Sequence, residues 1–159
     1  MVEDARFEDG GEKPLRLKAL DSDDLTVISA LVQDAIVPMG EISFDATARR
    51  FAMLLNRFRW EDLVAAEKRA RPVERVQAVL VFDDVIAAQS AGLEAGDKDT
   101  VISILAITFT PKTDGMGRVE ITLAGDGAIA LDLEALDVTL KDVTRPYLAP
   151  SRLTPDHDA

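Results

Sequence analysis

The sequence has no cysteine and only one histidine, His157, which stands third from the end. The absence of cysteine excludes disulfides, thiolate metal ligands and cysteine nucleophiles. Histidine is the usual general base and a common metal ligand near neutral pH, so a single copy beside the terminus argues against a histidine-based catalytic or zinc site. No carboxylate cluster has the spacing of a calcium-binding loop. We therefore expect no cofactor, no metal site and no catalytic residue.

Basic side chains and long apolar runs are also scarce. The chain carries 18 basic and 29 acidic residues, for a formal net charge of −11 and a pI near 4.5. Such a surface repels phosphate backbones and anionic lipids. No apolar run approaches the roughly 18 residues of a membrane span, and the first residues are acidic, unlike a signal peptide. We therefore expect a cytoplasmic protein that binds neither nucleic acid nor membrane.

The length and composition indicate one globular domain. The chain has 159 residues, of which 47% are hydrophobic and only 5% aromatic. Residues 1–14 are acidic and contain Gly10 and Gly11, and residues 146–159 contain three prolines. Neither segment has enough apolar residues to offset the entropy of ordering it. We therefore predict two flexible tails, 1–14 and 146–159, around a domain at 15–145.

One helix is predicted, over residues 22–35. Its apolar residues recur at helical spacing, Ser22 can cap its start, and Pro38 stops it. Most of the later sequence alternates with the two-residue period of strands. Residues 41–45 and 49–60 form a predicted hairpin, residues 118–133 form a second one around Gly125 and Gly127, and residues 136–143 continue as a third strand. Residues 75–85, 86–93 and 100–109 are further strands, the last apolar on both faces.

These elements predict an α+β fold. We expect a single domain with a curved antiparallel sheet of about six or seven strands and one N-terminal helix packed on it. The alternative is a barrel like that of pleckstrin-homology domains. That fold normally ends in a helix, whereas this chain ends in a proline-rich segment.

The strongest local feature is a basic segment, residues 49–75. It holds eight basic and four acidic residues, a net charge of +4, whereas the remainder of the chain carries −15. Its side chains split between the two faces of a strand, with an apolar middle. The arginines can pair with carboxylates of the same chain or a second subunit, which we favour, or with an acidic ligand or partner; nucleic acid is the least favoured. The candidate interaction residues are Arg49, Arg57, Arg59, Trp60, Arg69 and Arg71.

Four stretches carry a resemblance to a known family. They are LKALDSDDLTVISALVQDAIV, RRFAMLLNRFRWE, VISILAITFTP and GDGAIALDLEALDVTLKDV. Together they resemble an uncharacterised bacterial family, of about this length, that is classed as a domain of unknown function. The resemblance implies a bacterial cytoplasmic protein and assigns no site residue.

These observations favour a noncatalytic interaction module. We expect it to use a sheet edge or the basic segment to meet an acidic protein surface or a second copy of the chain, as a homo-oligomer. The alternative is a small-ligand-binding protein or a carboxylate-dependent enzyme, with Mg²⁺ as its only plausible metal.

Overall fold

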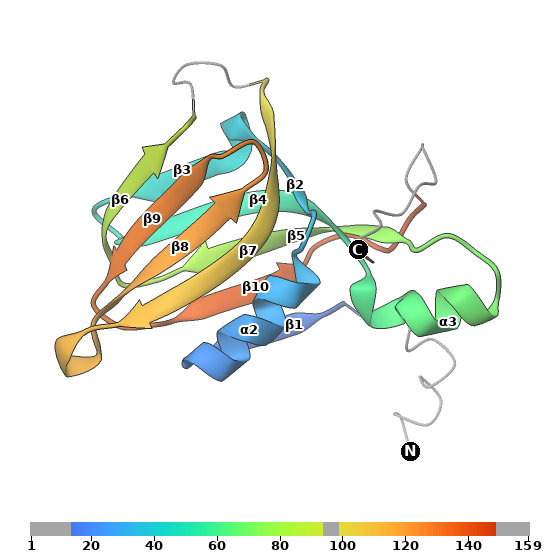
Figure 1. Ribbon diagram of the computed structural model, residues 1–159, viewed down its shortest axis with the longest axis horizontal. Coiled ribbons are helices and arrows are strands. Elements are labelled where there is room, and N and C mark those ends of the chain that lie inside the picture. Colours follow the sequence, from blue (N-terminus) through green and yellow to red (C-terminus); the bar gives the residue numbers. More distant parts are fainter. Residues whose placement is uncertain (1–13, 94–98, 149–159) are drawn as a thin grey trace.

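The protein, described by a computed structural model over residues 14–93 and 99–148, is built on one ten-stranded antiparallel sheet (Figure 1). The strands are β1 (Arg16–Ala19), β2 (Ile36–Pro38), β3 (Ile42–Asp45), β4 (Arg50–Phe58), β5 (Arg75–Phe82), β6 (Val85–Ala91), β7 (Val101–Pro111), β8 (Gly117–Leu123), β9 (Ala128–Leu133) and β10 (Val138–Asp142). The helices are α2 (Ser22–Leu31) and α3 (Leu63–Lys68), and short 3-10 turns are η2 (Met39–Glu41), η3 (Trp60–Asp62) and η4 (Thr113–Gly115).

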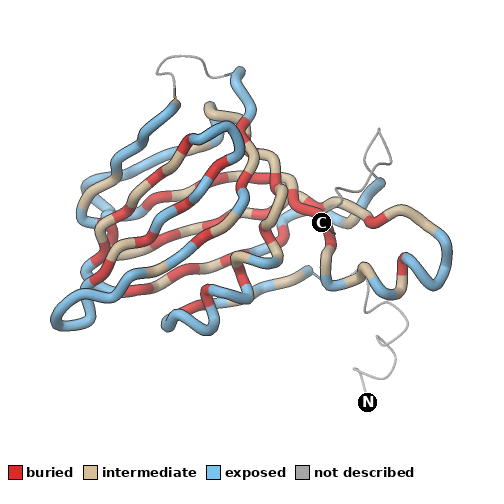
Figure 2. The backbone as a smooth tube through the Cα atoms, viewed as in Figure 1, coloured by how far each residue is buried: buried red, intermediate tan, exposed pale blue. Residues whose placement is uncertain are grey.

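The sheet folds over so that its two halves face each other. One half contains β1, β10, β5, β4 and β3, and the other contains β7, β8, β9 and β6, with β2 hydrogen-bonded to both β4 and β7 at the junction. Buried residues alternate along the strands (Figure 2), and a single apolar core joins Leu80, Phe82 and Leu140 of the first half to Ile121 and Leu131 of the second. The apolar residues that recur at every second position in the sequence form the inner face of this folded sheet.

The helix α2 packs on β1 and β7, and its Leu25 and Ile28 are buried in the core. It starts as predicted but ends at Leu31, four residues early, because Asp34 takes a positive φ of 64° and Ile36 begins β2. The cap is Asp21, not Ser22: the Asp21 side chain accepts a hydrogen bond of 2.8 Å from the backbone N–H of Asp24. Aspartate and serine are about equally good N-caps. Asp21 acts as the cap because it precedes the helix with an extended backbone, whereas Ser22 is already its first residue.

The predicted class of a mainly antiparallel sheet with few helices is confirmed, but the predicted six or seven strands are wrong. The sheet has ten. The two strands that lie where no strand was predicted, β1 and β2, are only four and three residues long. Neither is long enough to show alternation, and β2 lies where the helical pattern continues. A second helix, α3, was also not predicted, so the N-terminal helix is not the only one.

The predicted hairpins are confirmed. β3 pairs with β4, with Phe44 opposite Phe51, and β8 pairs with β9, with Ile121 opposite Ile129. The predicted strand over residues 100–109 is confirmed as β7, although its apolar residues are not all buried. β7 is a central strand between β2 and β8, yet Leu105 on it is exposed.

The sheet is open. β1 and β6 end its path, and in the described residues β10 is followed by a bridge between Arg75 and Tyr147, with no further helix. A pleckstrin-homology-like barrel, the alternative, would end in a helix. In the part of the chain that the structure describes, no helix is both long and apolar enough to cross a membrane.

The opening lies between β3 and β6. At one end β6 is tied to the turn between β3 and β4, since the N–H of Val85, the first residue of β6, donates to the Arg49 carbonyl at 2.9 Å. Further along, β6 has only β9 as a strand partner and β3 has only β4. The free edges of β3 and β6 therefore face an opening in the folded sheet.

Candidate functional site

The predicted interaction residue Arg57 is completely buried. Its side chain has 0% exposure, on the inner face at the end of β4. The guanidinium donates to both oxygens of Asp142, at 3.0 and 2.9 Å, and to both oxygens of Glu61, at 2.8 Å each. The remaining contact is to the Phe58 carbonyl. Arg57 thus has two bidentate carboxylate partners within its own chain, which is the geometry that best stabilises a buried guanidinium.

These contacts shift the pKa values of Arg57 and Glu61. Burial alone would lower the pKa of Arg57, but its hydrogen bonds to Glu61 and Asp142 outweigh burial and raise the pKa above its ordinary value. Burial alone would likewise raise the pKa of Glu61, but the hydrogen bonds and charge of Arg57 outweigh burial and lower it. Arg57 therefore stays charged, and its guanidinium donors are occupied by groups of its own chain, so it is not available to a ligand.

A second cluster lies beside it, where β4 leads into η3 and α3. The Arg59 guanidinium bonds to Glu74 at 2.7 Å and to Asp62 at 3.4 Å, and Arg71 bonds to Asp62 at 2.6 Å. All four groups are buried or half-buried. Two cations and two carboxylates therefore neutralise each other, and the cluster ties residues 59–74 together.

The other predicted residues are spread out. Arg49, in the turn before β4, pairs with Glu134 at 2.6 Å on the surface, and the Trp60 indole N–H donates to the Gln33 carbonyl at 2.9 Å. Arg69 is exposed and forms no ion pair with another described residue. The prediction that the arginines pair with carboxylates of their own chain is confirmed for Arg49, Arg57, Arg59 and Arg71. The six residues do not converge on a pocket.

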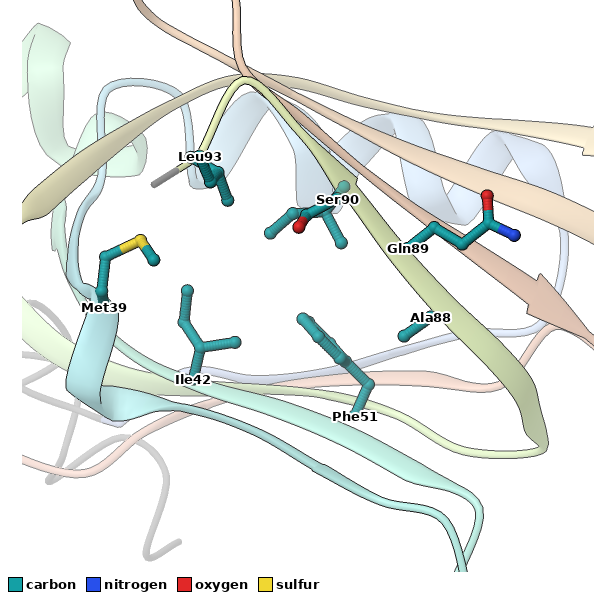
Figure 3. Close-up of a pocket in the computed structure, with 8 residues that line it drawn as sticks. Met39, Ile42, Phe51, Ala88, Gln89, Ser90 and Leu93 are labelled. Carbon is teal, nitrogen blue, oxygen red and sulfur yellow. The ribbon is translucent and has the colours of Figure 1, made fainter. Parts of the chain in front are cut away.

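A cavity does lie at the opening of the sheet. Its volume is about 280 Å³. Figure 3 shows the side chains of Met39, Ile42, Phe51 and Leu93 around the open space, with the Gln89 amide pointing away from it. We call this the edge cavity, and its lining is Met39, Ile42, Phe51, Ala88, Gln89, Ser90, Leu93 and Ile129.

The edge cavity exists because β6 has small inward side chains. Ala88 lies opposite Leu131 on β9 and Ser90 lies opposite Ile129, and both partners are buried in the core. Residues directly opposite each other share a face of the sheet, so Ala88 and Ser90 face inward, where neighbouring strands place Leu, Ile and Phe. The small side chains on β6 leave space between this strand and the core, and the edge cavity lies there.

A second cavity adjoins the first. Its volume is about 330 Å³, and it lies at the end of the folded sheet where β6 leaves, β7 begins and the β8–β9 turn closes. Met39 and Leu93 line both cavities. We call it the end cavity, and its lining is Met39, Gly92, Leu93, Thr100, Val101, Ile102, Ser103, Ala124 and Gly127.

The lining determines the chemistry that these cavities support. None of the residues that line either cavity is ionisable; the polar side chains are Gln89, Ser90, Thr100 and Ser103. Within residues 14–93 and 99–148, no three His, Cys, Asp or Glu side chains are placed to hold a metal ion. The arrangement suits the burial of an uncharged, largely apolar group.

The sequence contained a signal for this site. IAAQSAGL alternates like a strand but has small residues where the other strands have large ones. A strand whose inward positions are small leaves space in a core that is otherwise filled by large side chains. What the sequence could not supply is the face on which Ala88 and Ser90 lie, because that depends on pairing with β9 and on the irregular register near Val85.

Comparison with known proteins identifies a family but no characterised relative. A family model described as a protein of unknown function (DUF2948) matches residues 15–157, which confirms the resemblance drawn from the sequence. No curated protein and no solved structure shows a significant match.

Proposed function

Since the chain belongs to the DUF2948 family, whose description assigns no activity, we propose from its geometry that it is a noncatalytic protein that binds a small apolar ligand in the edge cavity. The observation that carries this proposal is an apolar cavity of about 280 Å³ that opens between two unpaired strand edges. A cavity with a few polar groups among apolar walls is the usual form of a small-molecule site.

The apolar walls supply the binding energy. Met39, Ile42, Phe51 and Leu93 are only partly covered or lie beside open space, so a ligand would remove their surface, and its own, from water. Burial of apolar area contributes about 25 cal/mol per Å². The hydroxyl of Ser90 and the free backbone groups of the β6 edge offer hydrogen bonds at the rim, which can orient the ligand.

The same lining argues against catalysis at this site. A general acid or base must reach the reacting atom within hydrogen-bond distance, and none of the side chains that line the edge cavity is titratable. The structure also brings together the ionised groups of Arg57, Asp142 and Glu61. These groups bond to one another and are not available to a substrate.

The proposal is tested with hexan-1-ol as the probe and with ¹³C-methyl-labelled methionine. Met39 lines the edge cavity, whereas Met116 lies in the connection between β7 and β8 and lines neither cavity. We expect hexan-1-ol to shift the Met39 resonance saturably and to leave Met116 unchanged. Ala88→Phe fills the cavity and is expected to weaken binding at least tenfold, because the phenyl ring occupies the space the alcohol needs.

Two further variants control this experiment. Ala87→Phe introduces the same ring on the same strand, but Ala87 lies opposite Asp132 on the outer face and does not line the cavity; binding is expected to stay within twofold of wild type. Ser90→Leu occludes the cavity from a different position and covers the case in which Ala88→Phe fails to fold. A Met39 resonance that does not respond to hexan-1-ol would overturn the proposal.

A second candidate function is self-association at α3. This helix packs against η3, away from the sheet (Figure 1), and it exposes Val64 by 65%. Lys68 and Arg69 at its end are exposed and form no ion pair with another described residue. The five arginines at 49, 50, 57, 59 and 71 of the basic segment are paired with carboxylates, and Arg75 stacks on the Phe58 ring, so Lys68 and Arg69 are its exposed cations without an ion pair to a described residue. A chain with a net charge of −11 offers acidic surface to such cations, so we propose a second copy as the partner.

Sedimentation equilibrium checks this candidate. We expect a weak dimer at about 50 mM salt that dissociates as salt screens the charges. Arg69→Glu should shift the protein to monomer, whereas Lys18→Glu, which alters a cation already paired with Asp137, should not. A monomer at every salt concentration would rule the candidate out.

A further inference from the structure

We propose that the ligand is an unbranched aliphatic chain with a neutral polar end, and that it runs from the edge cavity into the end cavity between Met39 and Leu93. This inference rests on the proposed function and extends it: it names the ligand class and gives the second cavity a role. It is carried by the shared walls of the two cavities, their sizes and the chemistry of their linings.

The two cavities meet at two adaptable side chains. Met39 follows β2 and Leu93 follows β6, and each contributes to the lining of both cavities. Figure 3 shows them on neighbouring sides of the same open space. Methionine is unbranched and polarisable and adjusts to irregular apolar shapes. A chain of methylene groups fits between two such side chains more readily than a ring or a branched group.

Size favours occupation of both cavities. Pockets for drug-sized ligands usually measure roughly 300–1,000 Å³. The edge cavity, at about 280 Å³, lies just below this range, and the end cavity, at about 330 Å³, lies at its lower limit. A ligand that extends through both cavities would occupy a volume well inside this range.

The polar groups indicate the chemistry of the polar end of the ligand. The edge cavity has the hydroxyl of Ser90 in its lining, and the end cavity has the hydroxyls of Thr100 and Ser103 and the backbone of Gly92 and Gly127 among its walls. Hydroxyls and backbone groups can bond an alcohol, ester or amide. No basic side chain lines either cavity, and the chain is strongly acidic. A carboxylate or phosphate head would therefore be unpaired and repelled.

A series of straight-chain alcohols tests the length of the site. Each buried methylene is worth about 0.8 kcal/mol, which is roughly a fourfold gain in affinity. We expect the dissociation constant, followed at the Met39 methyl resonance, to fall threefold to fourfold per methylene from hexan-1-ol through octan-1-ol to decan-1-ol. Decanoate should bind at least tenfold more weakly than decan-1-ol.

Gly127→Leu is the variant that isolates the end cavity. A Cβ at Gly127 would lie 3.2 Å from Leu93 Cδ2 and 3.4 Å from Leu123 Cδ1, so a larger side chain would project into the end cavity. We expect hexan-1-ol to bind this variant within twofold of wild type and the gain from longer chains to disappear. Val101→Trp, at an exposed position in the same lining, is expected to give the same result if Gly127→Leu does not fold.

The outcomes separate this inference from the proposed function. If hexan-1-ol binds but affinity does not rise with chain length, or rises equally in the two end-cavity variants, the extended site is wrong and the edge cavity still stands as a binding site. If no alcohol shifts the Met39 resonance, the proposed function itself is wrong. Equal binding of decanoate and decan-1-ol would overturn the assignment of a neutral head.

Discussion

Replacing Arg57 with methionine is expected to lower the free energy of unfolding by about 3–5 kcal/mol, because it leaves a buried carboxylate without its cation. Asp142 is 6% exposed and would retain only its hydrogen bond from the backbone N–H of Leu15, at 3.1 Å. Glu61 is 32% exposed and can turn to water, so the cost falls mainly on Asp142. Urea denaturation followed by circular dichroism measures the loss.

Two variants define the origin of this effect. Lys18→Met removes a surface cation from its pair with Asp137, and its cost is expected to stay below about 1 kcal/mol. The double variant Arg57→Met/Asp142→Leu removes the orphaned charge together with its partner and is expected to recover most of the lost stability. If the double variant is no more stable than Arg57→Met, the charge of Asp142 is not the source of the loss.

The second large effect is expected for Phe82→Ala, which should also cost about 3–5 kcal/mol. Phe82 is fully buried, and its ring meets that of Phe51 edge-on, with centroids 6.2 Å apart. The two residues are direct cross-strand partners on β5 and β4. Truncation would leave a void behind Phe51, a wall of the edge cavity.

Phe44→Ala is the matched control, since Phe44 is also a direct partner of Phe51 but is partly exposed on the edge strand β3. Its cost is expected to be much smaller. Thermal and urea unfolding of both variants, together with the hexan-1-ol titration, would show whether Phe82 also positions Phe51 for binding. A Phe82→Ala loss no greater than that of Phe44→Ala would contradict the burial argument.

Much of the fold follows from alternation that is visible in the sequence. Along β4, the inward residues Phe51, Met53 and Leu55 are buried, and this same period-two pattern predicts the hairpin with β3. The pattern fails where segments are too short to repeat it, as in β1 and β2. It also fails beyond Leu31, where apolar spacing continues but Asp34 turns the chain.

The candidate site was less accessible to sequence analysis, for a physical reason. A cluster of arginines is easily recognised in a sequence. The sequence does not reveal, however, whether the carboxylates that pair with these arginines belong to the same chain. Asp142, which binds Arg57, lies 85 residues away from it in sequence. The cavities have no charged residue in their lining that would mark them in the sequence. The edge cavity depends on which small residues of β6 face inward, and the pairing of β6 with β9 decides this.

The pairing of β1 with β10 has a consequence for how the chain acquires its structure. β1 has no other strand neighbour, and residues 16–19 meet residues 138–141. Of the described strands, the first to be synthesised therefore cannot pair until the last has been synthesised. Closing such a long loop is entropically costly and slow. Arg57, Leu15 and Asp142 come together at the same late step, so the sheet and its buried charge are completed only after nearly the whole described chain has been synthesised.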